Sequence, residues 1–344
     1  MNNRRGRRPR IGKVRHHEIF SRFRKWTGTV PPGIVADFLG TKTRTSYYTP
    51  ENLAPVAREE SPALPDFDEE YFEWIDLLEA AAAAKGRFTM MELGAGWGRW
   101  TARAAAAATQ LGLPYTLVAV EAEPTHFQWL KESLKENGVR MEDCRMVQAA
   151  VTAKDGTVGF HVGDPNSYGQ MLGGPVEIAA VSLPTLLAPL ELVDLIDMDV
   201  QCAELEILQA SREIVERVVK RIHVETHSHK LHLGVAKLFR ELGWRCHCSF
   251  EGNTRDDTVF GRINFQSGVQ SWLNPALNTP EQLRALHTYR NSFGFRGLQA
   301  GKGILDRVAP LGTRRRKLAR ALFSSLPAKF RRDPGDERKR PTAW

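Results

Sequence analysis

One ten-residue stretch, Met90 to Arg99, constrains the fold more than any other part of this 344-residue chain. It reads Met-Met-Glu-Leu-Gly-Ala-Gly-Trp-Gly-Arg, a short apolar strand that runs straight into three alternating glycines, and an alanine-rich helical stretch follows. A strand, a glycine turn and a helix in this order form the nucleotide-binding corner of α/β sheets, because glycine lets the backbone approach a ligand closely. The spacing is Gly-x-Gly-x-Gly, whereas dinucleotide sites use Gly-x-Gly-x-x-Gly. The stretch therefore favours a cofactor without a pyrophosphate, such as S-adenosylmethionine.

The segments that follow the glycine turn alternate between strand and helix patterns. We expect strands at 88–93, 115–120, 145–150, 192–198 and 221–225, and helices at 98–110, 124–136, 202–217 and 231–242. A helix over 65–85 with Asp66 as its N-cap precedes them, and strands at 244–250 and 258–265 follow as an antiparallel closing hairpin. This alternation predicts an α/β, Rossmann-like fold with a mostly parallel seven-stranded sheet.

Composition divides the chain into three parts. Residues 1–60 are rich in Arg, Pro and Thr and read as a basic arm, and residues 271–344 read as a basic extension that includes a basic amphipathic helix at 314–323. The α/β domain then spans 61–270. It contains an insertion at 152–182, where two strands at 157–162 and 176–183 flank a glycine-rich loop from which we expect Tyr168 to cover the site.

The positive charge of the chain lies at its ends. Residues 1–25 carry a net +9 and residues 313–344 a net +8, so the overall +8 leaves −9 for the part between them. Basic ends suit contact with an anionic surface, and solvated tails are the alternative reading. The chain shows no signal peptide or membrane-spanning run, and its four cysteines lack zinc spacing. We expect a reduced cytoplasmic protein, at most peripheral to a membrane.

An acidic residue, Glu121, ends the second predicted strand, 23 residues after Gly98. A carboxylate in this position can accept both ribose hydroxyls of an adenosine cofactor, or it can simply stabilise a helix N-terminus. Its coupling to the glycine turn favours the cofactor role.

Four segments in the same order carry a family resemblance: Glu92 to Gly98, Val120 to Pro124, Asp194 to Leu208, and Arg221 to Glu225. Together they resemble the FkbM family of S-adenosylmethionine-dependent methyltransferases, which mostly methylate hydroxyls of sugars and polyketides. The resemblance covers about residues 88–265. It implies a class I methyltransferase fold in which the methionine end of the cofactor is held by Glu92, Gly94, Ala95, Gly96 and Gly98. Glu121 would hold the ribose, and Gln148 or Ala149 would lie near the adenine.

The chain departs from the family in its fourth-strand motif, which usually reads Lys-Ile-Asp-Val-Glu-Gly-Ala-Glu. Asp199, Val200, Ala203 and Glu204 match, whereas Asp197, Met198, Gln201 and Cys202 replace Lys, Ile, Glu and Gly. The lost Lys and Glu change the local charge, but the carboxylate of Asp199 stays at the strand end.

Asp199 and Glu225 end two neighbouring predicted strands, which leaves two mechanisms open. The carboxylates could hold Mg²⁺ that binds the acceptor hydroxyl, or a carboxylate or histidine could remove the hydroxyl proton directly. His227 is the preferred base candidate, while His223 reads as a structural residue. An iron site built from these histidines is a third reading that the cofactor motifs do not support.

These patterns predict an enzyme that transfers methyl groups to a hydroxyl of a saccharide or other small metabolite. An RNA methyltransferase that uses the basic ends is one alternative, although no stable nucleic-acid complex is expected from the acidic body. A non-catalytic scaffold in glycan assembly or at a membrane is another. The acceptor and the oligomeric state stay undetermined at this point.

Overall fold

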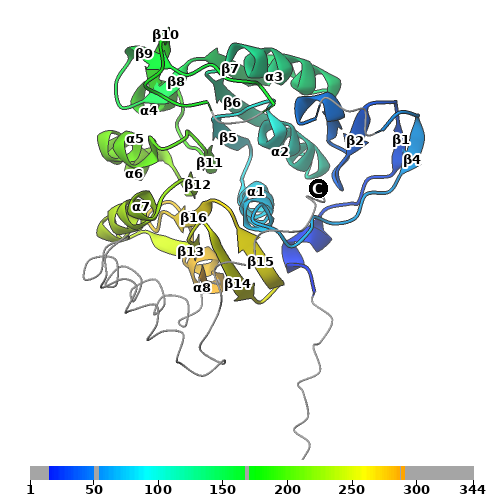
Figure 1. Cartoon of the computed structure of the whole chain (residues 1–344). Helices are drawn as coiled ribbons and strands as arrows, with labels where there is room; N and C mark the ends of the chain where they lie inside the picture. The colour runs from blue at the N-terminus through cyan, green and yellow to red at the C-terminus, as the bar shows by residue number, and fades with distance from the viewer. Residues whose placement is uncertain (1–14, 50–53, 167–169, 287, 291–344) are drawn as a thin grey trace, which may run out of the picture. The chain divides into compact units, whose positions relative to one another are not determined.

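A computed structural model describes residues 15–49, 54–166, 170–286 and 288–290 (Figure 1). At its centre lies a sheet with the strand order β17-β13-β16-β12-β11-β5-β6-β7. The five strands from β12 to β7 run parallel, and β16 runs antiparallel to both β12 and β13. The predicted seven-stranded, mostly parallel Rossmann-like sheet is thus confirmed, with the short β17 added at its edge. The strands of this sheet are β5 (Phe88–Leu93), β6 (Tyr115–Glu121), β7 (Cys144–Gln148), β11 (Leu195–Met198), β12 (Arg221–Thr226), β13 (Arg245–Phe250), β16 (Gly268–Leu273) and β17 (Tyr289–Arg290).

Helices cover both faces of this sheet, and each face has its own apolar core (Figure 1). Residues of β5 alternate between the two: Phe88 and Met90 pack in the core with α1, α2 and α3, whereas Met91 and Leu93 pack with α4 to α7. The helices are α1 (Tyr71–Ala83), α2 (Arg99–Gln110), α3 (Pro124–Glu136), α4 (Leu183–Leu187), α5 (Glu204–Ala210), α6 (Arg212–Val218), α7 (His229–Glu241) and α8 (Pro280–Ala285). In the described part of the chain, none of them is long and apolar enough to cross a bilayer.

The first helix begins later than predicted, at Tyr71, and Asp66 does not cap it. The reason lies in the acidic residues before it, which are used in tertiary contacts. Glu69 accepts hydrogen bonds from the backbone N–H groups of Gln266 and Ser267, and Glu70 forms an ion pair with Arg99. The helix predicted over 202–217 is also divided, into α5 and α6.

The predicted closing hairpin is wrong in its second strand. β13 pairs with β16, whereas β15 (Gly261–Phe265) pairs with β14 (Thr254–Thr258) in a separate two-stranded sheet. β16 was not predicted from the sequence because two of its buried residues, Gln270 and Ser271, are polar. Both are satisfied by long-range hydrogen bonds, from Gln270 to the carbonyl of His232 and from Ser271 to Asp76.

Small elements surround this body. The basic arm contains, in chain order, the 3₁₀ helix η1 (Glu18–Arg22), the strands β1 (Gly28–Val30), β2 (Ile34–Ala36) and β3 (Lys42–Arg44), the 3₁₀ helix η2 (Thr45–Tyr47) and the strand β4 (Arg58–Glu60). Arg44 forms ion pairs with Glu132 and Glu136 of α3. After η3 (Met141–Asp143) and β7, the insertion forms a sheet of β8 (Ala150–Thr152), β10 (Val176–Ser182) and β9 (Gly156–Phe160), which confirms its two predicted strands. Tyr168, the helix at 314–323 and most of the basic ends lie outside the described residues.

Candidate functional site

The glycine turn joins β5 to α2 at the carboxyl ends of the parallel strands. The N–H groups of Gly94 and Ala95 both donate to the carbonyl of Val120 at 2.9 Å. Gly94 has a φ of +83°, and a Cβ atom there would overlap the carbonyl oxygen of Asp199. Gly98, with a φ of +74°, begins α2 at a point where a Cβ atom would overlap the side chain of Leu130. The turn needs glycine at both positions because of backbone conformation and of close approach.

Glu92 supports the turn from below. Its carboxylate accepts hydrogen bonds from the N–H groups of Trp100 and Thr101, at 3.2 and 2.8 Å, and from the Thr101 hydroxyl. It therefore caps the N-terminus of α2, where a negative charge is favourable. Burial and the neighbouring carboxylate of Asp197 nevertheless raise the pKa of Glu92 to about 8.

Glu121, at the end of β6, ties the turn to the next helix. One carboxylate oxygen accepts the N–H of Gly96 and the other accepts the N–H of Glu123, both at 2.7 Å. Burial raises the pKa of this carboxyl group, which is only 7% exposed. The contact of Glu121 with a ribose stays a prediction, and both of its oxygens accept a backbone N–H group in this structure.

A first cavity, which we call the Glu121 cavity, lies beside this carboxylate. Of the two residues predicted to lie near an adenine, Ala149 lines this cavity, whereas Gln148 is exposed and is absent from its described lining. The insertion closes one side with Phe160, Gln170 and Leu172. Met171 of the insertion also lines it, and the remaining described walls come from the glycine turn, β6, α3, β8 and the end of β11: Gly94, Gly96, Val120, Ala122, His126, Ala150, Val151, Asp199, Val200 and Gln201.

A second cavity of about 400 Å³, the carboxylate cavity, lies on the other side of the turn. It shares Gly94, Gly96 and Asp199 with the Glu121 cavity, so the two spaces meet at these three residues. Tyr48, Trp97 and Trp100 contribute aromatic walls. Seven acidic residues line it: Glu69, Glu70, Glu73, Glu92, Asp197, Asp199 and Glu225.

The structure brings the three predicted catalytic residues together. Asp199, Glu225 and His227 each offer a ligand atom within 4.8 Å of the others. His227 Nε2 lies 3.2 Å from Asp199 Oδ1, and His227 Nδ1 lies 3.0 Å from Glu204 Oε1. Among the described residues, Asp199 lines both cavities and His227 lines neither. His227 therefore lies behind Asp199, outside the described lining of both cavities.

The pKa values of Asp199 and His227 are both raised, but for different reasons. Burial, followed by the charge of Glu225, raises the pKa of Asp199 to about 8. Burial lowers the pKa of His227, but the hydrogen bond to Glu204 and the charge of Asp199 outweigh it and raise the value to about 9. The ring of His227 lies between the carboxyl groups of Asp199 and Glu204 and restricts the position of Asp199.

The same three residues fit Mg²⁺ poorly. Mg²⁺ prefers oxygen ligands in octahedral geometry, whereas a set with histidine suits transition metals. Moreover, Asp199 Oδ1 already accepts a hydrogen bond from Gln201 at 2.9 Å, and both nitrogens of His227 have carboxylate partners.

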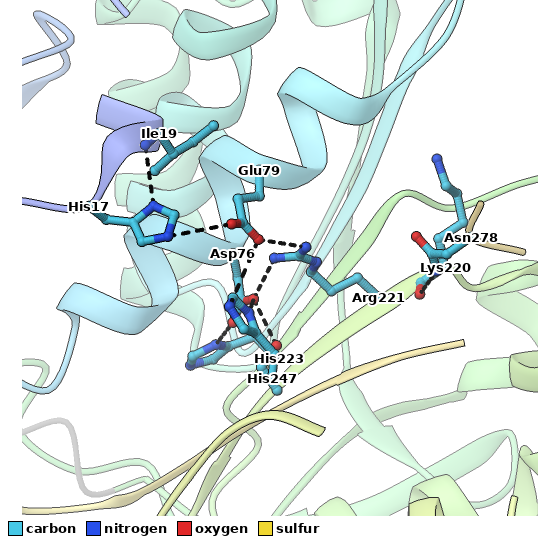
Figure 2. Close-up of polar contacts among 10 residues, drawn as sticks. His17, Ile19, Asp76, Glu79, Lys220, Arg221, His223, His247 and Asn278 are labelled. Atoms are coloured by element: carbon cyan, nitrogen blue, oxygen red, sulfur yellow. Dashed lines mark hydrogen bonds and ion pairs between the residues drawn. The ribbon is translucent and has the colours of Figure 1, made fainter. Parts of the chain in front are cut away.

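Sequence reasoning missed two further features of the site. Glu204, which is fully buried, holds His227, although the motif drew attention to it only as a match. Asp76 of α1 accepts hydrogen bonds from His223, His247, Arg221 and Ser271, as Figure 2 shows for the first three. The strand register places Glu92, Asp197 and His223 side by side. The sequence signal available for this row of polar residues was the acidic residue one position before the end of each of two strands, Glu92 in β5 and Asp197 in β11.

The comparisons with known proteins match the part of the chain that contains these motifs. The family model of the methyltransferase FkbM domain matches residues 86–246. A protein of Jannaschia sp. (strain CCS1) named "Putative methyltransferase" is 26% identical over 235 residues, which cover 63% of this chain and 84% of that protein.

Two solved structures are more distant. A methyltransferase FkbM from Methylobacillus flagellatus KT has a TM-score of 0.39 and 11% identity, over 56% of this chain and 45% of that one. A precorrin-6y C5,15-methyltransferase from Geobacter metallireducens GS-15 has a TM-score of 0.37 and 12% identity, over 58% of this chain and 85% of that one. The match to the family model confirms the resemblance seen in the motifs: residues 86–246 of this chain match the methyltransferase FkbM domain.

Proposed function

We propose that the chain transfers a methyl group from S-adenosylmethionine to a hydroxyl of a saccharide or a related polyhydroxylated metabolite. One observation carries the proposal: Gly94, Gly96 and Asp199 line both cavities, so a cofactor site and an acceptor site meet at a carboxylate. A methyl donor and a hydroxyl have to meet in this way, because the reaction needs oxygen, carbon and sulfur in one line.

The residues around the glycine turn suit this cofactor. Glu121 offers carboxylate oxygens to a ribose, Ala149 and Val151 offer apolar contact to a base, and the positive φ of Gly94 keeps the turn free of side chains. When bound, S-adenosylmethionine supplies a methyl group that its positive sulfur has already activated. The protein's own contribution is to orient the two reactants and to exclude water.

Asp199 is the group placed to accept the hydroxyl proton. Its raised pKa, about 8, suits a general base near neutral pH. His227 is a positioning residue in this scheme, since its ring holds the carboxylate from behind and is itself held by Glu204. Glu225 lies close enough to raise the basicity of Asp199 through its charge.

The lining of the carboxylate cavity argues against RNA as the acceptor. Seven acidic side chains would repel a phosphate backbone, whereas a neutral or cationic small molecule meets no such barrier. We therefore favour a small hydroxylated acceptor over the nucleic-acid alternative.

Isothermal titration calorimetry with S-adenosylhomocysteine tests the cofactor part. We expect binding to the wild-type protein, and at least ten-fold weaker binding to Glu121→Gln and Glu121→Ala. Glu142→Gln is the matched control because Glu142 is an exposed carboxylate away from both cavities. The proposal is contradicted if the folded wild-type protein does not bind S-adenosylhomocysteine, or if the Glu121 variants bind it with equal affinity.

A further inference from the structure

The carboxylate cavity carries more negative charge than its own cations neutralise. Two of its lining groups are cationic or can become so, and both have partners: Arg99 pairs with Glu70, and His223 with Asp76. Glu92 is committed to the N-terminus of α2. Even if Asp199 serves the transferred group, Glu69, Glu73, Asp197 and Glu225 form no ion pair with another described residue. Arg99, His223 and His227 lie near enough to act on three of these four carboxyl groups, but they are fewer than the carboxyl groups of the cavity.

Two of these carboxyl groups, Glu73 of α1 and Asp197 of β11, lie close enough to shift each other's pKa. Asp197 is only 7% exposed. Burial raises the pKa values of both groups, and their mutual repulsion raises that of Glu73 further. A positive ligand group beside them would favour the ionised form of both groups, because opposite charges attract.

His223 provides a second, independent sign that the cavity binds a polar ligand. Its ring is 3% exposed and lines the cavity, and Nδ1 contacts Asp76 Oδ2 at 2.7 Å (Figure 2). Asp76 accepts three other hydrogen bonds, so this orientation of the ring is fixed. Nε2 then has no hydrogen-bond partner among the described residues. A ring nitrogen that opens onto a cavity can pair with water or with a hydroxyl of a ligand.

Glu225 is a further unsatisfied group at the same wall. It follows His223 by two residues on β12, and it makes no hydrogen bond or ion pair with another described residue. An ammonium group between Glu225 and the Glu73–Asp197 pair would meet three carboxyl groups, while hydroxyls of the same molecule could reach His223 Nε2.

We propose that the acceptor carries a protonated amine beside its hydroxyl groups, as an amino sugar or aminocyclitol does, and that Glu73, Asp197 and Glu225 bind this amine. The inference rests on the proposed function, since it places the acceptor in the cavity next to the methyl donor. It refines the substrate class from a polyol to a cationic polyol. Cation and carboxylate then meet in a partly buried space, where charge pairing is stronger than in water.

Calorimetry on the full chain saturated with S-adenosylhomocysteine tests the proposal. Glucosamine, N-acetylglucosamine and glucose are the probes, at pH 7 with EDTA present so that no divalent cation takes the place of the amine. We expect glucosamine to bind at least ten-fold more tightly than either neutral probe. Glu225→Gln and Glu73→Gln should reduce this preference at least three-fold, and Glu142→Gln should keep it.

The possible results distinguish a failure of the proposed function from a failure of the amine assignment. If S-adenosylhomocysteine does not bind, the proposed function fails. If it binds but glucosamine binds no more tightly than glucose, the charged acceptor is wrong and the methyltransferase proposal stands. A preference for glucosamine that survives both Gln variants, in protein that still binds S-adenosylhomocysteine, also overturns the assignment.

Discussion

Gly94 and Asp199 approach each other so closely that a Cβ atom on Gly94 would overlap the carbonyl oxygen of Asp199. The backbone N–H of Asp199 also donates to the carbonyl of Leu93 at 2.9 Å. The residue that shapes the predicted cofactor turn and the proposed base are therefore fixed to one another through the backbone. A change in the turn must also move the base.

Gly94→Ala is expected to reduce affinity for S-adenosylhomocysteine at least ten-fold and to lower the free energy of unfolding. The alanine meets both a left-handed φ and a backbone atom that cannot move without shifting β11. Gly86→Ala is the matched control, because Gly86 has a φ of +76° but no atom within 4 Å of its Cβ position. It should lose about 1 kcal/mol of stability and keep its affinity. Equal losses in both variants would show that φ alone matters.

Local spacing was enough to predict the part of the site that lies within short segments. Gly94, Glu121 and Asp199 each follow a strand, and carboxyl ends of parallel strands share one sheet edge, so their convergence follows from the alternation pattern. The contacts of His227 and Asp76 could not be predicted in this way. They join elements far apart in the chain, and they depend on helix packing and strand register. β16 was missed for the same reason, since its buried Ser271 is satisfied only by Asp76.

Methyl transfer is expected to depend on the ionisation of Asp199. Burial and Glu225 raise its pKa to about 8, so the rate should rise with pH up to about 8 and then level. Glu225→Gln removes a neighbouring negative charge, which lowers the pKa of Asp199 and moves this rise to lower pH. A rate profile with labelled S-adenosylmethionine and the acceptor measures it, and an unmoved profile in Glu225→Gln contradicts the coupling.

The ionisation of Asp199 is also expected to affect the stability of the protein without ligand. Because the folded pKa of Asp199 is raised above its unfolded value, its protonation stabilises the folded state fully below the unfolded pKa of 3.8. This contribution is lost as the pH rises through about 8. The melting temperature should therefore fall between pH 6 and pH 8.5, and it should fall less in Asp199→Asn. Scanning calorimetry across this range checks the sign.

Glu204→Gln tests the positioning role of His227. The hydrogen bond to Glu204 helps to raise the pKa of His227 to about 9, so the variant should lower that value while the contact survives sterically. A neutral His227 holds Asp199 less firmly, and methyl transfer should fall about ten-fold with S-adenosylhomocysteine affinity unchanged. The His227 pKa is measured by proton NMR titration. If it does not move, or if affinity falls as much as rate, Glu204 serves the fold alone.

Asp76→Asn is expected to cost about 3–5 kcal/mol of unfolding free energy, because it removes the charge from a buried ion pair. Asp76 is fully buried and accepts hydrogen bonds from Arg221, His223, His247 and Ser271 at 2.7 to 2.9 Å. Against the effect of burial, the charges of Arg221 and His247 hold its pKa well below the usual range. Urea unfolding at pH 7 measures the loss, with the exposed Asp66→Asn as control. If both variants unfold at the same urea concentration, the buried network contributes no net stability. If Asp76→Asn is the less stable, the hydrogen-bond network that fixes the ring of His223 also stabilises the fold.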